Sequence, residues 1–186
     1  MITKILKFGG SSVSTPEMIR KASKIVVGAS KKACLERSRK ACPEHGRRNG
    51  VVVVVSAFQG ITDQLLSLAK LAFSNSCELE NRFKELKNRH LDAVNKLVKN
   101  KKRRKEVVEY VEKLMEELNG VLEKIRGRKE ALPKELDLIA SFGERLSAFI
   151  VSAHISDTFS VKSYFADARE FVRTDDNFVN AAVYFN

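Results

Sequence analysis

Apolar residues along the chain follow two different periods, and their order predicts an α/β fold. Residues 3–8 alternate weakly between apolar and polar side chains, which is typical of a β-strand. Residues 51–55 are all valine, and an unbroken β-branched run favours a strand buried on both faces of a parallel sheet. Residues 161–165 predict a further short strand.

Helical periodicity fills the segments between these strands. Ser-Thr-Pro-Glu at residues 14–17 provides a capping hydroxyl and a first-turn proline, and the helix is expected to continue over residues 18–27. Further helices are expected over residues 62–73 and 135–155. Residues 28–50 are polar and basic, and they predict a long loop, or the end of the helix followed by a loop.

A long charged stretch separates the second of these helices from the last. Residues 79–126 repeat apolar side chains at helical spacing, which predicts two long helices joined near Asn100. We expect them to form a helical hairpin at about residues 78–127. His90 belongs to this stretch, and a helix-surface position is favoured for it over a ligand role.

The order strand, glycine turn, helix, buried strand, turn and helix predicts an α/β fold with a largely parallel sheet sandwiched by helices. The helical hairpin is an insertion into that fold. Ligands of such folds bind at the carboxyl ends of the strands. Residues 9–12 and 56–62 are therefore the expected site.

Composition narrows the class of protein. The chain has 186 residues, of which 44% are hydrophobic, which suits one globular domain. No apolar run approaches the roughly 20 residues that span a bilayer, and the N-terminus lacks a signal-peptide pattern. The three cysteines form no C-x-x-C pair, so reduced thiols are expected. These features predict a cytoplasmic protein.

The net charge of +11 is high and is concentrated in residues 31–48 and 96–105. Such clusters are compatible with nucleic acid or an acidic membrane. Neither cluster interleaves aromatic residues as single-strand-binding surfaces do. Solvated loop and helix faces are therefore the favoured interpretation, and neither a membrane nor a nucleic acid is an expected partner.

The first motif with candidate chemistry is K-F-G-G-S-S-V at residues 7–13. Gly9 and Gly10 allow backbone N–H groups to approach an anion closely. The following helix N-terminus adds positive potential, and Lys7 can reach a phosphate as a point charge. The alternative is a plain strand-to-helix turn.

Two further motifs contain polar side chains near apolar segments. Ser56 and Thr62 flank the turn after the valine strand and can hold a small polar substrate, although Thr62 can instead cap a helix that begins at Asp63. Glu144 lies within an apolar helix, where a buried carboxylate needs a cationic partner. A substrate ammonium group or Arg145 would serve as that partner.

Together these segments resemble the aspartate kinases of the amino-acid kinase superfamily. Residues 7–13 match that family's K-F-G-G-[TS]-S-V opening, and residues 56–63 match S-A-x-x-G-[VI]-T-[DN]. Residues 141–144 match S-x-G-E, and residues 174–178 match T-D-[DN]-[NR]-F. The four motifs occur in the family's order over nearly the whole chain, which makes the set far more specific than any one of them.

The resemblance implies a reaction and its phosphate site. An aspartate kinase transfers the γ-phosphate of ATP, with Mg²⁺, to the side-chain carboxylate of L-aspartate, which gives 4-phospho-aspartate and begins lysine, threonine and methionine biosynthesis. Lys7, Gly9, Gly10 and Ser11 would bind the ATP phosphates, and Lys7 would be the catalytic residue that stabilises the charge of the transferring group.

The resemblance also implies the aspartate site. Ser56 and Thr62 would contact aspartate, and Glu144 would pair with its ammonium group. The nucleophile is already ionised near neutral pH, since an aspartate carboxyl has a pKa of about 3.9. The reaction needs no general base, and the absence of a candidate catalytic His–Asp pair is no objection.

The chain departs from the family in two ways. Residues 28–50 are longer and more basic than the usual connection, and the later L-G-R-G-G-S-D segment, with the ACT regulatory domains, is absent. Residues 1–186 are therefore expected to be the N-terminal portion of an amino-acid kinase domain. We expect this portion to be inactive alone, and to form a homo-oligomer or to need a missing C-terminal half.

Three alternatives stay open. The first is a kinase for another small carboxylate in the same superfamily. The second is a non-catalytic remnant or interaction subunit, favoured by the missing segments. The third, a basic nucleic-acid binder, has only the net charge in its support.

Overall fold

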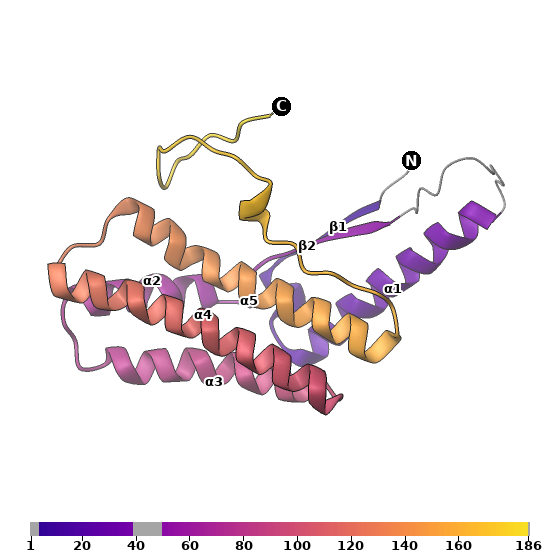
Figure 1. Cartoon of the computed structure of the whole chain (residues 1–186), viewed down its shortest axis with the longest axis horizontal. Helices are drawn as coiled ribbons and strands as arrows, with labels where there is room; N and C mark the ends of the chain where they lie inside the picture. The colour runs from indigo at the N-terminus through magenta and orange to yellow at the C-terminus, as the bar shows by residue number, and fades with distance from the viewer. Residues whose placement is uncertain (1–3, 39–49, 186) are drawn as a thin grey trace.

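A small parallel sheet and a set of long helices make up the molecule. A computed structural model describes residues 4–38 and 50–185, without the side chains of residues 33–38. The elements in chain order are β1 (Lys4–Phe8), α1 (Pro16–Ser38), β2 (Val51–Val55), α2 (Ile61–Phe73), α3 (Leu79–Leu97), α4 (Lys101–Arg128) and α5 (Pro133–Phe159). Short 3-10 turns occur at Gly10–Val13 and Ala168–Glu170. Figure 1 shows α2 to α5 extending lengthwise together, with α1 leading away beside the strands.

The two strands pair in parallel, as the sequence predicts. Lys4 faces Val51 and Phe8 faces Val55 in register, and the Ser56 N–H donates to the Phe8 carbonyl at 3.0 Å beyond the end of β2. The prediction that β2 is buried on both faces is wrong for the described residues. Val52 and Val54 are 49% and 47% exposed, because α1 and α5 cover only the face to which the alternate valines point.

α1 extends into residues 28–50, which fits the second interpretation of that segment, a helix end followed by a loop. The Thr15 hydroxyl accepts from the Met18 N–H at 3.3 Å, so the predicted hydroxyl cap is confirmed. The helix then continues past residue 27 to Ser38. A glycine in a helix interior costs only about 1 kcal/mol, and the Ala, Lys, Glu and Arg residues that follow Gly28 favour helix. Residues 39–49 of the predicted loop lie outside the described residues.

Residues 161–165 do not form the predicted strand. They are extended, and their side chains alternate between half-buried and exposed positions. The half-buried ones pack on helices rather than beside the sheet: the Ser163 hydroxyl lies 3.0 Å from that of Ser152, and Phe165 meets Phe149 edge to face. The alternation therefore comes from a segment that lies over helices, and residues 161–165 pair with no strand among the described residues. We call residues 161–167 the strap.

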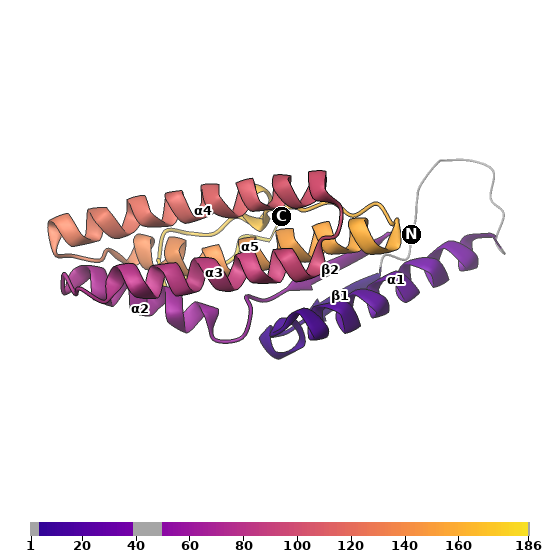
Figure 2. The ribbon, with the colours of Figure 1, turned by 90° about the horizontal axis from the view of Figure 1, so that it is seen from below.

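The predicted helical hairpin is α3 and α4, joined by residues 98–100. The Asn100 side chain caps α4 by accepting from the Arg103 N–H at 3.1 Å. Asp157 of α5 accepts from the Lys99 N–H at 2.7 Å, which fastens the corner to the rest of the molecule. The apolar residues predicted to line α4 are all buried: Val107, Val111, Leu114, Leu118 and Leu122. Figure 2 shows α3 and α4 lying along the same direction.

His90 lies in the core, so the predicted surface position is wrong. Its side chain is fully buried, its ring stacks on Phe58 at 5.2 Å, and its Nδ1 lies 2.9 Å from the Leu86 carbonyl oxygen. That distance suits an Nδ1–H donor, which makes the ring a neutral, flat filler of the space beside α3. Burial lowers the pKa of His90 to about 4.

The second basic cluster, Cys77 and the apolar helix α5 can each be compared with the sequence predictions. Lys99, Lys101, Lys102 and Lys105 of the second basic cluster are exposed. Cys77 is a free, exposed thiol. α5 is long and apolar enough to cross a membrane by length and composition alone, but 56% of that stretch is buried inside the protein, as in a core helix.

α5 packs against α2 and the loop after β2 at a glycine. A Cβ atom added at Gly143 would lie 2.7 Å from the Ala57 Cβ, 3.3 Å from the Ile61 Cγ2 and 3.4 Å from the Leu65 Cδ1. The first of these distances is shorter than carbon atoms tolerate, so the helix and the loop can approach this closely only over a glycine.

We predict that Gly143→Ala lowers the free energy of unfolding by about 1–3 kcal/mol, the usual cost of overpacking a core. Gly120→Ala in α4 is the matched control, because nothing lies within 4 Å of the added Cβ there. It should raise stability by about 0.5–1 kcal/mol. Urea unfolding of the two variants measures both effects, and equal stabilisation by both would show that the contact at Gly143 is loose.

We predict that stability falls on acidification in part through His90. Its pKa is lowered in the folded protein, so its contribution is complete above the unfolded pKa near 6.5 and is lost as pH falls from there towards 4. The shift corresponds to about 3 kcal/mol. His90→Gln, which cannot titrate, should show a flatter fall in unfolding free energy between pH 7 and 4; parallel curves would contradict the assignment.

Candidate active site

Three of the four predicted motifs meet at Ala57, just beyond the carboxyl end of β2. A Cβ at Gly10 would lie 3.2 Å from the Ala57 carbonyl oxygen, and Gly143 approaches the Ala57 methyl group. The Glu144 Oε1 accepts from the Ala57 N–H at 3.2 Å. The glycine turn after β1, the loop after β2 and the S-F-G-E segment of α5 therefore touch at one buried residue.

The glycine turn opens towards solvent at one glycine and packs at the other. Gly9 is exposed and extended, and nothing lies within 4 Å of an added Cβ there. Its carbonyl accepts from the Ser12 N–H at 2.9 Å, which closes the turn that carries Ser11 at its exposed surface. Gly10 is the position that needs a glycine, because the loop after β2 lies directly against it.

Lys7 is exposed on the open face of the sheet, opposite Val54 in the register. It makes no ion pair within the part of the chain that the structure describes. A lysine at the carboxyl end of a strand, beside an open glycine turn, is placed to meet an anion from solvent.

The structure removes the capping explanation for Thr62. α2 begins at Ile61, and its N-cap is Gly60, which adopts the left-handed conformation with φ of 77°. Thr62 already lies within the first turn, so the alternative that it caps a helix beginning at Asp63 is wrong. The half-buried hydroxyls of Ser56 and Thr62 make no hydrogen bond to other described residues, and both remain available to a ligand.

Glu144 is exposed, so the prediction of a buried carboxylate is wrong. Position 144 faces the loop after β2, where Oε1 takes the Ala57 N–H and Oε2 makes no hydrogen bond to the described residues. Its neighbour Arg145 is the buried member of the pair and turns away to other carboxylates. Glu144 therefore keeps acceptor capacity for a cationic ligand.

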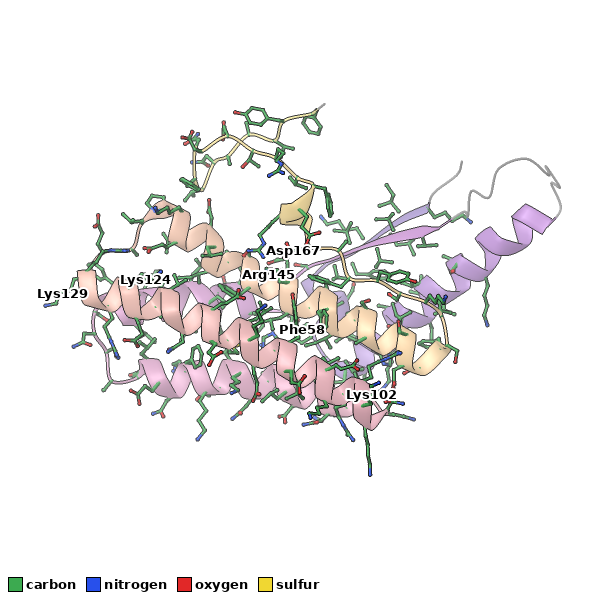
Figure 3. All side chains as sticks on the ribbon, in the orientation of Figure 1. Phe58, Lys102, Lys124, Lys129, Arg145 and Asp167 are labelled. Carbon is green, nitrogen blue, oxygen red and sulfur yellow. The ribbon has the colours of Figure 1, made fainter. Side chains whose placement is uncertain are left out.

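An ionic cluster around Arg145 escaped the sequence analysis. The Arg145 Nη2 lies 3.2 Å from Glu117 Oε2 of α4, and its Nε lies 3.3 Å from Asp167 Oδ2. Figure 3 shows Arg145 and Asp167 together where the chain passes over α5. A hydrogen bond from Arg169 lowers the pKa of Asp167 and, with a smaller contribution from Arg145, keeps it ionised. No local pattern pairs residues 22 positions apart, so only the fold reveals the cluster.

The fourth motif, at residues 174–178, lies apart from Ala57. Thr174 bridges Val183 in a short antiparallel contact, and the Val179 N–H donates to Asp137 of α5 at 2.8 Å. Arg173, which directly precedes this motif, is exposed. The described contacts bring neither the motif nor Arg173 to the other three segments.

The helical hairpin holds the loop after β2 from its other side. Arg89 of α3 donates to the Gln59 carbonyl at 2.8 Å, and His90 stacks on Phe58. A pocket of about 170 Å³ lies here, lined by Thr15, Phe58 and Arg89 among others. The predicted site residues do not line this pocket, so it is separate from the meeting point at Ala57.

Comparison with known proteins shows to which family the chain belongs. Residues 3–183 match the model of the amino acid kinase family. Aspartokinase 1, chloroplastic, of Arabidopsis thaliana is 30% identical over 181 residues, which is 94% of this chain and 27% of the relative. Aspartokinase 2, chloroplastic, of the same plant is 27% identical, over 98% of this chain and 30% of the relative.

Solved structures show the same fold. E. coli aspartokinase III in complex with aspartate and ADP superposes with a TM-score of 0.77, and its complex with lysine and aspartate with 0.74. Both are 22% identical and cover 98% of this chain and 35% of the neighbour. The chain thus spans about a third of the length of the proteins it matches. The predicted resemblance and the predicted fold class are confirmed, and the chain belongs to the amino acid kinase family.

Proposed function

We propose that the protein carrying this chain is an aspartate kinase, which transfers the γ-phosphoryl group of ATP to the side-chain carboxylate of L-aspartate. The product is 4-phospho-aspartate, and the reaction opens lysine, threonine and methionine biosynthesis. The observation that carries this proposal is the meeting of three motif segments at Ala57. The glycine turn, the hydroxyls of Ser56 and Thr62 and the carboxylate of Glu144 all belong to these three segments, and this supports the proposal.

The ATP phosphates would lie at the glycine turn. Gly9 leaves its backbone open to close approach, and Gly10 and Ser11 follow it at the start of a 3-10 turn. Backbone N–H groups in such turns bind anions. Lys7 supplies the charge that grows in importance as the phosphoryl group is transferred.

Aspartate would lie between the loop after β2 and α5. The hydroxyls of Ser56 and Thr62 would bind its polar groups, and Glu144 would accept from its ammonium group through Oε2. The E. coli enzyme of the same fold has been solved with aspartate and ADP bound, which supports a site for both ligands in this fold.

Phosphoryl transfer to aspartate requires the protein mainly to position the two substrates. The attacking carboxylate is ionised at neutral pH, so the residues need only orient it and neutralise phosphate charge. The described residues contain no group of three or more His, Cys, Asp or Glu that could hold a metal ion. They offer no cage for Mg²⁺, and we propose that the ion arrives on the ATP phosphates, as Mg²⁺ commonly does.

We predict that Lys7→Ala lowers kcat of the full-length protein by about 100-fold or more, because it removes a charge that stabilises the transition state. The KM for aspartate should change little. Lys101→Ala is the control, since it removes one exposed lysine of α4 that is remote in sequence from the motifs. A coupled assay for ADP, run with aspartate and with glutamate, measures the effect and the substrate. Near-normal turnover of Lys7→Ala would refute the assignment, and preference for glutamate would favour the other carboxylate kinases.

We predict that Glu144→Gln weakens aspartate binding about tenfold or more, since it removes the charge that meets the ammonium group. The amide oxygen can still accept from the Ala57 N–H, so the melting temperature should change little. Glu144→Ala should lower both the affinity for aspartate and the melting temperature. Calorimetry with aspartate and with ADP on the full-length protein separates the two ligands. Loss of ADP binding with aspartate binding intact would show that the role is misassigned.

A further inference from the structure

We propose that Arg145 and Asp167 form a positioning pair that holds Glu144 in place for substrate binding. This proposal rests on the proposed function, because it assigns to Glu144 the recognition of the substrate ammonium group. Neither residue of the pair touches the substrate. Their effect passes through α5 and through the segment that follows it.

The pair is an ionic contact with almost no access to water. The side chains of Arg145 and Asp167 are 9% and 10% exposed. The Arg145 guanidinium also lies 4.9 Å from the centre of the Phe142 ring. Its Nη1 is buried without a hydrogen-bond partner, and its Nε meets Asp167 by charge rather than by a well-aligned hydrogen bond. Asp167 is the more buried of the two carboxylates that neutralise this guanidinium, since Glu117 is 42% exposed. Loss of the Asp167 charge would leave the buried guanidinium with one half-exposed partner, which is unfavourable.

Arg145 can transmit this constraint because it is the next residue to Glu144 on one helix. Consecutive helix residues point about 100° apart, so one turn of α5 faces the ionic cluster with Arg145 and the loop after β2 with Glu144. A helix turn moves as a unit. If this turn of α5 shifts to bring the Arg145 guanidinium to water, Glu144 is displaced with it.

The contact of Glu144 with the loop has little tolerance for such a movement. Its hydrogen bond from the Ala57 N–H is 3.2 Å long, at the upper end of the normal range. Gly143 already lies closer to the Ala57 methyl group than a residue with a Cβ atom could. A small rotation of α5 would therefore either break the hydrogen bond or press the helix into the loop.

Asp167 also fixes the strap that covers α5. Its side chain accepts from the Arg169 N–H at 3.1 Å and from the Arg169 guanidinium at 2.8 Å, which shapes the turn at Ala168–Glu170. Upstream, Phe165 packs against Phe149 and Tyr110. The pair thus joins the strap, α5 and, through Glu117, the helical hairpin at one guanidinium.

The decisive variant is Asp167→Asn, which keeps the shape of the side chain and removes its charge. Glu135→Gln is the matched control. Glu135 belongs to α5, the helix of Arg145 and Glu144. Like Asp167, it is almost buried, at 11% exposed, and it pairs with an arginine, Arg128, at 2.6 Å. It lies nine residues before Glu144, or about 13 Å along the helix. Both variants remove the charge of an almost buried carboxylate that pairs with an arginine, although Arg128 is 41% exposed and Arg145 is 9% exposed. Only Asp167→Asn removes that charge beside the site.

The Ala57 amide reports the position of Glu144 without any assay of activity. That N–H is buried and donates to the Glu144 carboxylate. We expect Asp167→Asn to speed its hydrogen exchange, followed by NMR, about tenfold relative to Glu135→Gln, the effect of losing one hydrogen bond. Glu144→Ala sets the upper limit. Glu117→Gln, which changes a half-exposed carboxylate, should show a smaller effect in the same direction and serves if Asp167→Asn does not fold.

Kinetics of the full-length protein give the second readout. Asp167→Asn should raise the KM for aspartate about tenfold and leave the KM for ATP and kcat nearly unchanged, because the glycine turn does not contact the pair. Equal Ala57 exchange in Asp167→Asn and Glu135→Gln would overturn the proposal and reduce the pair to a stabilising contact. Faster Ala57 exchange in a protein that does not phosphorylate aspartate would uphold the link between Asp167 and Glu144 but refute the proposed function.

Discussion

The approach of α5 to the loop after β2 is the contact on which the candidate site depends. Ala57 donates its N–H to Glu144, presents its methyl group to Gly143 and lies with its carbonyl against Gly10. The packing is limited by atomic size, because Gly10 and Gly143 have no side chain and Ala57 between them has the smallest one. A larger residue at any of the three positions would separate the segments that carry the candidate binding residues.

The helical hairpin adds further contacts to the loop after β2 and to α5. α3 holds the next two residues of the same loop, Phe58 by stacking with His90 and Gln59 by a hydrogen bond from Arg89. α4 contributes Glu117 to the cluster around Arg145. The loop is thus held between α5 on one side and α3 on the other. The helical hairpin therefore supports the candidate site, although none of the four sequence motifs lies within it.

Sequence reasoning succeeded where a local pattern has a single structural consequence. The carboxyl ends of parallel strands meet at one edge of a sheet, so the turn after β1 and the loop after β2 had to be neighbours. It failed where the outcome depended on what packs against a segment. Residues 161–165 carry the alternation of a strand but lie on helices, and His90 carries a polar ring that the core accepts as a flat neutral group. The two faces of β2 look alike in sequence, because every residue is valine, and only the placement of the helices distinguishes them.

The exposure of Glu144 beside the buried Arg145 follows from the cost of desolvation. A carboxylate that is buried without a cationic partner lowers the stability of the fold, so a carboxylate with no such partner is more stable at an exposed position. In this fold Glu144 stays exposed and is oriented by one backbone N–H, while Arg145 accepts the buried position and meets two carboxylates there. The ion pairs of Arg145 thus lie on one side of this turn of α5, and the exposed Glu144 carboxylate lies on the side that faces the loop after β2. A single helical turn can hold both because an interval of one residue directs neighbouring side chains to different surroundings.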